Sequence, residues 1–389
     1  MNIEQQKRWF PFFLVLCEMA TYLSTDMYLP ALPAIARDFG ATQDMVQYTL
    51  AAWFIGSGSL QLFIGPLADR YGRKKVLLSG ALIFVLSSLA CTLTDDIVTF
   101  TYIRFLQGTT VCTVLVAGYA VVHELFEQKK AIQLLTWMGA ITILAPALGP
   151  ILGALIESLG SWRNIFHVLA AIGVFSLCAL SVSMPETNPK PVPINLRKIT
   201  QDYWSILKNK HFMRYTGSSC ILVMGFFAWI VESPFILIET YQHTQLFFGV
   251  AQLVVFSGFI LGAKAAKYTL ARTSIERLLH LGFSIAFASA LFLLFSAYYL
   301  NEYAFIVGML GVALGSSMTF GSLNRLAVDS CQEPMGSRVA MYWSIRGMAG
   351  GLAGILVTVF GNNTLPALAW LCAICVGIGV VVISIKPRN

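Results

Sequence analysis

The sequence predicts an all-α membrane protein with twelve transmembrane helices arranged as two six-helix halves. Composition is the first reason, because hydrophobic residues make up 57% of the 389 residues, charged residues only 12%, and the mean hydropathy is +0.72. A soluble domain carries about 25% charged residues. The second reason is that apolar runs of about 20 residues, long enough to cross a bilayer, recur along the whole chain.

The apolar runs give the predicted spans in order. All are interpreted as helices, because a helix satisfies its own backbone polar groups in lipid and the alternating pattern of a barrel strand is absent. The first is expected to be a retained span rather than a cleaved signal peptide. The spans are predicted at 10–32, 46–68, 76–94, 98–121, 131–156, 163–184, 213–239, 245–268, 277–299, 302–327, 337–361 and 364–386, with boundaries good to several residues.

One hydrophilic segment, residues 185–212, divides the spans into two sets of six. It begins with a proline-rich stretch and continues as an amphipathic surface helix. The predicted organisation is therefore an N-terminal six-helix half over 1–184, a cytoplasmic middle loop over 185–212 and a C-terminal six-helix half over 213–389.

Basic residues predict the orientation. Of the 26 Lys and Arg residues, almost all fall in loops on one side, whereas the opposite loops carry only Arg37 and Arg163. Basic loops stay in the cytoplasm, so both termini and the middle loop are expected there, in a bacterial inner membrane. The net charge of +7 is explained by these loops and not by a nucleic-acid partner.

Two acids lie inside the first apolar run, at Glu18 and Asp26. A carboxylate at bilayer depth costs several kcal/mol unless it is protonated, paired or exposed to a polar cavity. Two such groups on one span, able to face the same cavity, indicate transport driven by protons. Arg104 lies inside the fourth span, at a depth similar to that of Asp26 at about 1.5 Å per residue, so a contact is feasible if the two helices are neighbours. The alternative is that Arg104 extends to the outer surface.

Two further segments have their residues in a characteristic order. Residues 65–75 read GPLADRYGRKK, a Gly/Pro turn with one acid among four bases. This string resembles the signature loop of the major facilitator superfamily, which implies a gating role for Gly65, Asp69, Arg70, Gly72 and Arg73. Residues 145–153 read APALGPILG and resemble that superfamily's antiporter motif, which implies export. A helix that merely packs closely through glycine and proline is the alternative. The matching residues are Ala145, Pro146, Gly149, Pro150 and Gly153.

The resemblance narrows to one group within the superfamily. LCEMATYLSTDMYLP, YIRFLQG, AGYAVVHELFE, APALGPILG and AWIVESP follow the order of the MdfA-type multidrug/proton antiporters, and TDMYLPALP resembles the related Bcr/CflA transporters. The resemblance implies proton coupling by Asp26, Glu18 and Arg104. It also implies substrate contacts from Glu18, Asp26, Tyr22, Gln107 and Tyr119, with Glu124 nearby. Two residues that depart from the pattern, Glu232 and Arg346, are added to the expected substrate contacts, and their depths make a pair between them unexpected.

The sequence therefore predicts a monomeric, proton-coupled antiporter that exports small lipophilic cationic or neutral compounds by alternating access. No catalytic residue, metal, cofactor or enzymatic activity is expected, and no phosphate-binding loop of the G-x-x-x-x-G-K-[ST] type occurs to support ATP drive. Three alternatives remain: a dedicated exporter of one endogenous metabolite or siderophore-like product, a proton-coupled importer, and a non-transporting membrane scaffold or sensor.

Overall fold

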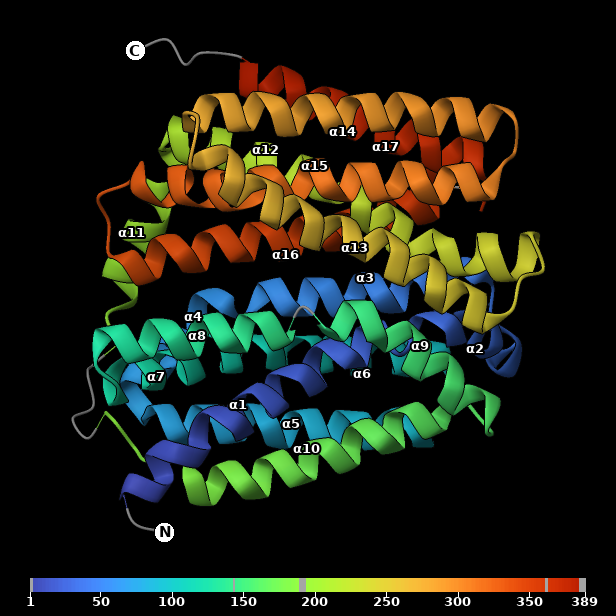
Figure 1. Ribbon diagram of the computed structural model, residues 1–389. Helices are drawn as coiled ribbons and strands as arrows, with labels where there is room; N and C mark the ends of the chain where they lie inside the picture. The colour runs from blue at the N-terminus through green and yellow to red at the C-terminus, as the bar shows by residue number, and fades with distance from the viewer. Residues whose placement is uncertain (1–2, 143, 189–193, 361–362, 385–389) are drawn as a thin grey trace. The chain divides into compact units, whose positions relative to one another are not determined.

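The structure is a computed structural model that describes residues 3–142, 144–188, 194–360 and 363–384, and the regular elements in these ranges are all helices (Figure 1). The predicted all-α fold class is therefore confirmed. The chain separates into two compact units, Met1–Leu196 and Arg197–Asn389. Within the predicted middle loop, residues 189–193 lie outside the described ranges, and the predicted surface helix corresponds to α11.

Among its described residues, the first unit contains ten α-helices, a 3₁₀-helical turn, η1, and a π-helical turn, η2, which joins α6 to α7. Their bounds are α1 Ile3–Asp26, η1 Leu29–Ala31, α2 Leu32–Phe39, α3 Gln43–Ser59, α4 Gln61–Tyr71, α5 Arg73–Leu93, α6 Ile97–Thr113, η2 Val114–Gly118, α7 Tyr119–Leu125, α8 Gln128–Thr142, α9 Leu144–Ser158 and α10 Arg163–Ser183.

The described part of the second unit contains the remaining seven α-helices and one more π-helical turn. Their bounds are α11 Leu196–Lys208, α12 Lys210–Pro234, η3 Phe235–Thr240, α13 Gln245–Leu270, α14 Ile275–Tyr298, α15 Glu302–Asp329, α16 Met335–Phe360 and α17 Leu365–Ser384.

The spanning segments agree with the predicted apolar runs, with one difference in number. Among the described residues, 10 helices are long and apolar enough to cross a membrane, and the pair α3 and α4, bent by 46°, makes 11. Helix α1, in the position of the first predicted span, is not among them. Its apolar run is interrupted by Glu18 and Asp26, which lower its mean hydropathy.

The first predicted span, 10–32, was wrong as a single helix. Helix α1 ends at Asp26, and the chain continues through η1 into α2. Pro30 and Pro33 explain the break, because proline lacks a backbone donor and restricts the residue before it. Several other helices begin where a polar side chain caps them; Asp96, for example, accepts a hydrogen bond from the Thr99 amide at 2.7 Å at the start of α6.

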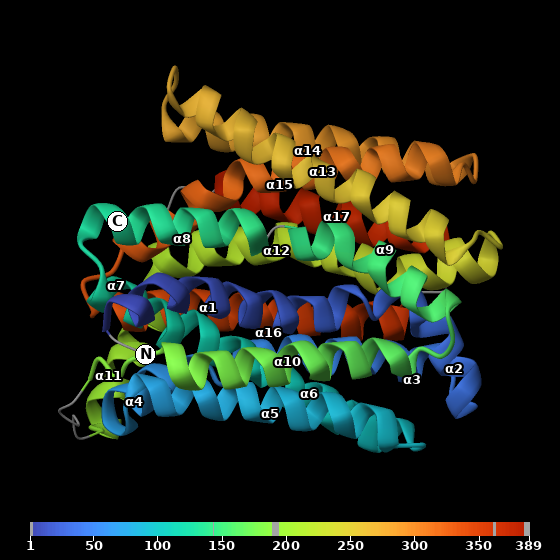
Figure 2. The ribbon, with the colours of Figure 1, turned by 60° about the horizontal axis from the view of Figure 1, so that its bottom comes forward.

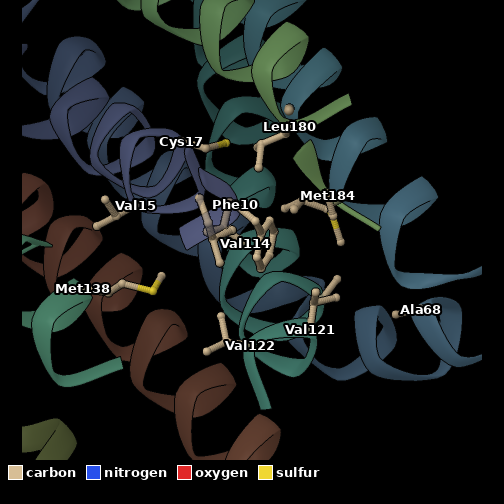
Figure 3. Close-up of a cluster of buried hydrophobic side chains, with 14 of the residues drawn as sticks. Phe10, Val15, Cys17, Ala68, Val114, Val121, Val122, Met138, Leu180 and Met184 are labelled. Carbon is tan, nitrogen blue, oxygen red and sulfur yellow. The ribbon is translucent and has the colours of Figure 1, made fainter. Parts of the chain in front are cut away.

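In the first unit, α1 packs along α10 and also contacts α8 and α9, while α3 packs along α6 and α5 along α10 (Figure 2). Apolar side chains of α1, α4, α5, η2, α7, α8 and α10 form a buried cluster around Phe10 and Val114 (Figure 3). This cluster includes Cys17, the residue before Glu18. Packing therefore fixes α1 up to the position of its first acid.

In the second unit, α12 packs against α15, α16 and α17, and α15 packs against α13 and α14 (Figure 1). Among the described spans, Lys210–Thr240, which consists of α12 and η3, has the largest buried share, with 78% of its apolar stretch inside the protein.

Candidate functional site

Three polar residues follow one face of α1. Glu18, Tyr22 and Asp26 are spaced four residues apart, which places them one above another on a helix. Glu18 and Asp26 are buried, with 2% and 7% of their surfaces exposed, and Tyr22 is half-buried. Tyr22 lies close enough to interact electrostatically with both carboxyl groups. The structure therefore brings these three predicted residues together on one face of α1.

Glu18 is held by a tyrosine from the fourth span. The Tyr119 hydroxyl donates to Glu18 Oε1 at 2.8 Å. Glu18 Oε2 is buried and has no hydrogen-bond partner among the described residues. The Thr142 hydroxyl is near the carboxyl group, but it donates to the Met138 carbonyl at 2.9 Å. One oxygen of this acid is thus positioned and the other is available.

Asp26 occupies the last position of α1, and no basic residue lies in that last turn. A helix C-terminus carries a partial negative charge, so it does not stabilise an ionised carboxylate. Among the described residues, no basic side chain lies within 4.0 Å of Asp26. Asp26 therefore has no ion-pair partner among the described residues.

The predicted antiporter motif packs directly on Asp26. Gly149 of α9 lies so close that a Cβ there would be 2.5 Å from the Asp26 Cβ, and a Cβ at Gly153 would collide with the Met27 carbonyl. Ala145 and Pro150 are buried beside them, and Pro146 is half-buried. The two glycines are therefore required for α9 to approach the end of α1 that carries the acid.

Arg104 is completely buried on α6, so it does not extend to the surface. Its Nη1 donates to the Ser24 carbonyl at 3.0 Å and to Gln107 Oε1. The guanidinium carbon lies 4.5 Å from the centre of the Tyr28 ring, a cation–π distance. Its Nε and Nη2 atoms have no hydrogen-bond partner among the described residues.

The contact between Asp26 and Arg104 that the depth estimate made feasible is not formed. Arg104 instead contacts the backbone two residues earlier, at Ser24, whose hydroxyl accepts from Trp53 Nε1 at 3.2 Å. Gln107 continues the network by donating to the Ser88 hydroxyl at 2.8 Å. Sequence reasoning missed Ser24, Tyr28 and Ser88, because depth along a helix does not say which way a side chain faces.

The predicted gating loop forms an ion-pair network. Arg73 Nη2 lies 2.7 Å from Glu124 Oε1 and 3.3 Å from Asp69 Oδ1, and its Nε donates to both oxygens of Glu124 at 2.9 and 3.0 Å. Gly72, between α4 and α5, has a φ of 98°, a conformation that side chains rarely adopt. The loop therefore joins the ends of α4, α5 and α7.

A segment after α10 completes this network. Both Glu186 oxygens accept backbone hydrogen bonds at the start of α5, from Arg73 at 3.0 Å and Lys74 at 3.2 Å. The Asn188 side chain donates to the Asp69 carbonyl at 2.8 Å. A carboxylate at a helix N-terminus is favourable. Both residues belong to the predicted middle loop. An acid and an amide directly after the sixth predicted span were the signal that could have identified them.

The other members of the loop motif have less specific surroundings. Arg70 is exposed, and its guanidinium lies 5.6 Å from the centre of the Tyr71 ring. Gly65 is half-buried within α4, and only Val116 would be near a side chain placed there, at 3.9 Å.

In the second unit, the two departures from the family pattern lie apart. Arg346 of α16 is half-buried and its Nη1 donates to the Ser219 hydroxyl at 2.8 Å. Glu232 is 1% exposed, on the same helix as Ser219 but near its opposite end. Among the described residues they form no ion pair, as their estimated depths predicted.

Comparisons with known proteins agree with the helical arrangement. The sequence profile of the Major Facilitator Superfamily matches residues 14–358. The chain is 32% identical over 335 residues to the chloramphenicol resistance protein CraA of Acinetobacter baumannii, covering 85% of this chain and 81% of that protein. It is 32% identical over 381 residues to the multidrug transporter MdfA of Edwardsiella ictaluri, covering 94% and 92%. Among solved structures, a D-xylose–proton symporter matches with a TM-score of 0.76 at 13% identity, covering 97% of each chain, which shows the fold.

Proposed function

Because the chain belongs to the Major Facilitator Superfamily, a family of membrane transporters, we propose that it exports small lipophilic compounds in exchange for protons. The names of its relatives, a chloramphenicol resistance protein and a multidrug transporter, support substrates of this kind. The proposal includes action as a monomer in a bacterial inner membrane, with both termini in the cytoplasm, as the basic loops indicate.

The observation that carries the proposal is the acidic face of α1. Two buried carboxyl groups share this face, and no basic side chain of the described residues lies within 4.0 Å of either. An ionised carboxylate in such a place needs a positive partner. A proton and a cationic or hydrogen-bonding substrate can each serve Glu18 or Asp26, but not the same group together. This competition supports an exchange of one for the other.

The proposed exchange also needs two conformations. The ion pairs of the gating loop can be formed in one conformation and broken in the other. Arg73 is bound at once to Asp69 and Glu124, and the same turn is capped by Glu186. Such a set of charged contacts between helix ends is a two-state element when it is intact in one conformation and separated in the other. We assign it the role of stabilising one access state.

The test is accumulation of a panel of lipophilic cations and neutral antibiotics in cells with and without the transporter. We expect lower accumulation with it, and loss of this difference when an uncoupler collapses the proton gradient. Asp26→Asn should be expressed but should not export against a gradient. Asp44→Asn removes an exposed acid from the first turn of α3 and is the matched control, which should export like wild type.

Two results would contradict the proposal: export that persists without a gradient, or Asp26→Asn exporting uphill as well as wild type. A transporter that lowers the accumulation of no drug in the panel would favour the dedicated export of one endogenous product.

A further inference from the structure

The second unit contains an arginine with no acidic partner. Among the described residues no carboxylate lies within 4.0 Å of the Arg346 guanidinium. Its positive charge is held by neutral groups: the Ser219 hydroxyl, which also hydrogen-bonds the Tyr342 hydroxyl at 2.8 Å, and the Phe320 ring, whose centre is 4.4 Å from the guanidinium carbon. Arginine has five N–H donors in a planar fork, and the hydroxyls of Ser219 and Tyr342 take up only part of it.

A second polar group lines the same space. Arg346, Ser219 and Ser316 all border one cavity between α12, α13, α15 and α16. Ser316 is only 4% exposed, and its hydroxyl has no hydrogen-bond partner among the described residues. Buried hydroxyls are normally satisfied, and an unsatisfied one costs about 1–3 kcal/mol. A donor without an acceptor therefore lies beside a cation without an anion.

These two observations together define the missing partner. The guanidinium can only donate and the Ser316 hydroxyl can donate as well, so an acceptor satisfies both groups, and the positive charge of Arg346 favours an anion. The free space is ≈ 10 Å³, about the room that one water-sized group needs. A carboxylate therefore places at most one of its oxygens in this space. Apolar side chains, Leu222 and Val223 among them, form other parts of the lining.

We propose that this cavity recognises a carboxylate on the transported compound, with Arg346 and Ser316 as donors and Ser219 positioning the guanidinium. The inference rests on the proposed export function and deepens it. The acidic face of α1 suits cationic or neutral compounds, whereas this site adds lipophilic carboxylates, and zwitterions that carry both charges, to the substrate class.

The test is a calorimetric titration of the purified full-length protein in detergent, where no proton gradient exists. The probes are naphthoate, neutral naphthamide and cationic naphthylmethylammonium, which share one ring system, and acetate, which has the carboxylate alone. We expect Arg346→Met to weaken naphthoate binding about 10-fold or more, because a charge-assisted hydrogen bond is lost. Naphthylmethylammonium binding should not change. Ser316→Ala should also weaken naphthoate binding, by about 10-fold, because the hydroxyl donates to the same charged carboxylate.

The matched control is Arg325→Met, which removes an exposed arginine that is ion-paired with Asp329 on α15. It should bind all four probes like wild type. Arg346→Lys keeps the charge without the fork and should fall between wild type and Arg346→Met. If Arg346→Met does not fold, as judged by size-exclusion chromatography, the lysine and Ser316→Ala variants carry the test.

Naphthoate binding that is equal in wild type and all Arg346 and Ser316 variants would overturn the inference, as would acetate binding as tightly as naphthoate, which would indicate an anion site unrelated to substrate. The outcome is separate from that of the export assay. Failure of gradient-driven export would remove the proposed function and leave the titration standing, while loss of Arg346 dependence would leave export untouched.

Discussion

A methyl group added at Gly149 would occupy space that Asp26 already fills. A Cβ there would lie 2.5 Å from the Asp26 Cβ and 3.2 Å from its carbonyl carbon. Carbon atoms pack at about 3.5–4.0 Å, so α9 and the end of α1 would have to separate locally by about 1 Å. Overpacking of this kind costs about 1–3 kcal/mol. We therefore expect Gly149→Ala to lower thermal stability and, because it displaces Asp26, to impair export.

The assay compares unfolding of the purified protein and drug export in cells with those of Gly139→Ala. Gly139 of α8 lies in the same unit, and apart from its own helix backbone no heavy atom of the described residues lies within 4 Å of a Cβ placed there. The same substitution at this open helical position should be neutral or stabilise by up to about 1 kcal/mol, since alanine favours the helix. The comparison separates the effect of the contact from that of the residue change.

A double-mutant cycle identifies the partner in the contact. If the Asp26 Cβ is the obstacle, Gly149→Ala should cost less stability in an Asp26→Gly background, where that atom is absent. Equal effects of Gly149→Ala and Gly139→Ala, or strict additivity in the cycle, would refute the reasoning. The motif would then be explained by close helix packing alone.

Two further predictions follow from other contacts. Arg104→Met should remain folded, because no ion pair is broken. It should lose export, because the charge that orders Ser24 and Gln107 is gone. Full export by this variant would show that the charge is dispensable. At the other end of the first unit, the Arg163 guanidinium holds the pKa of Asp38 below its usual value of 3.8. Because its pKa is lower in the folded protein, Asp38 contributes its full stabilisation at pH values above its pKa in the unfolded chain. It loses this contribution as the pH falls through its lowered pKa in the folded protein. The free energy of opening of α2, obtained from hydrogen exchange relative to the intrinsic rate, should therefore be higher in wild type than in Asp38→Asn at neutral pH, by no more than about 1 kcal/mol. This difference should vanish well below pH 3.8. A difference that persists at that acidity would contradict this assignment.

Helix positions were predictable because each depends on the local chain. The predicted span 245–268 corresponds to α13, Gln245–Leu270, since a capping threonine precedes it and the apolar run sets its length. The bend of 46° between α3 and α4 was not predicted. Hydropathy measures how apolar a segment is but carries no direction, and the Gly- and Ser-rich end of α3 only permits a bend.

The candidate site was predictable to a different degree. Glu18, Asp26 and Arg104 were found because a charged residue in an apolar run is conspicuous whatever surrounds it. Their partners were not, because the hydroxyl of Tyr119 and the carbonyl of Ser24 are ordinary groups that matter only through the rotation of each helix about its axis. The contact between Asp26 and Arg104, which similar depths made feasible, shows the limit: the guanidinium binds the carbonyl of Ser24, two residues before the acid.

The position of Arg104 changes what its charge can do. An arginine bound to Asp26 would neutralise that acid and compete with any proton for it. In the structure it instead binds the Ser24 carbonyl in the last turn of α1, where the helix end carries partial negative charge, and lies against the Tyr28 ring beyond that end. It can therefore fix the end of α1, against which Gly149 packs, without occupying the carboxylate. Asp26 stays available to a proton or substrate, while the helix that presents it is held from both sides.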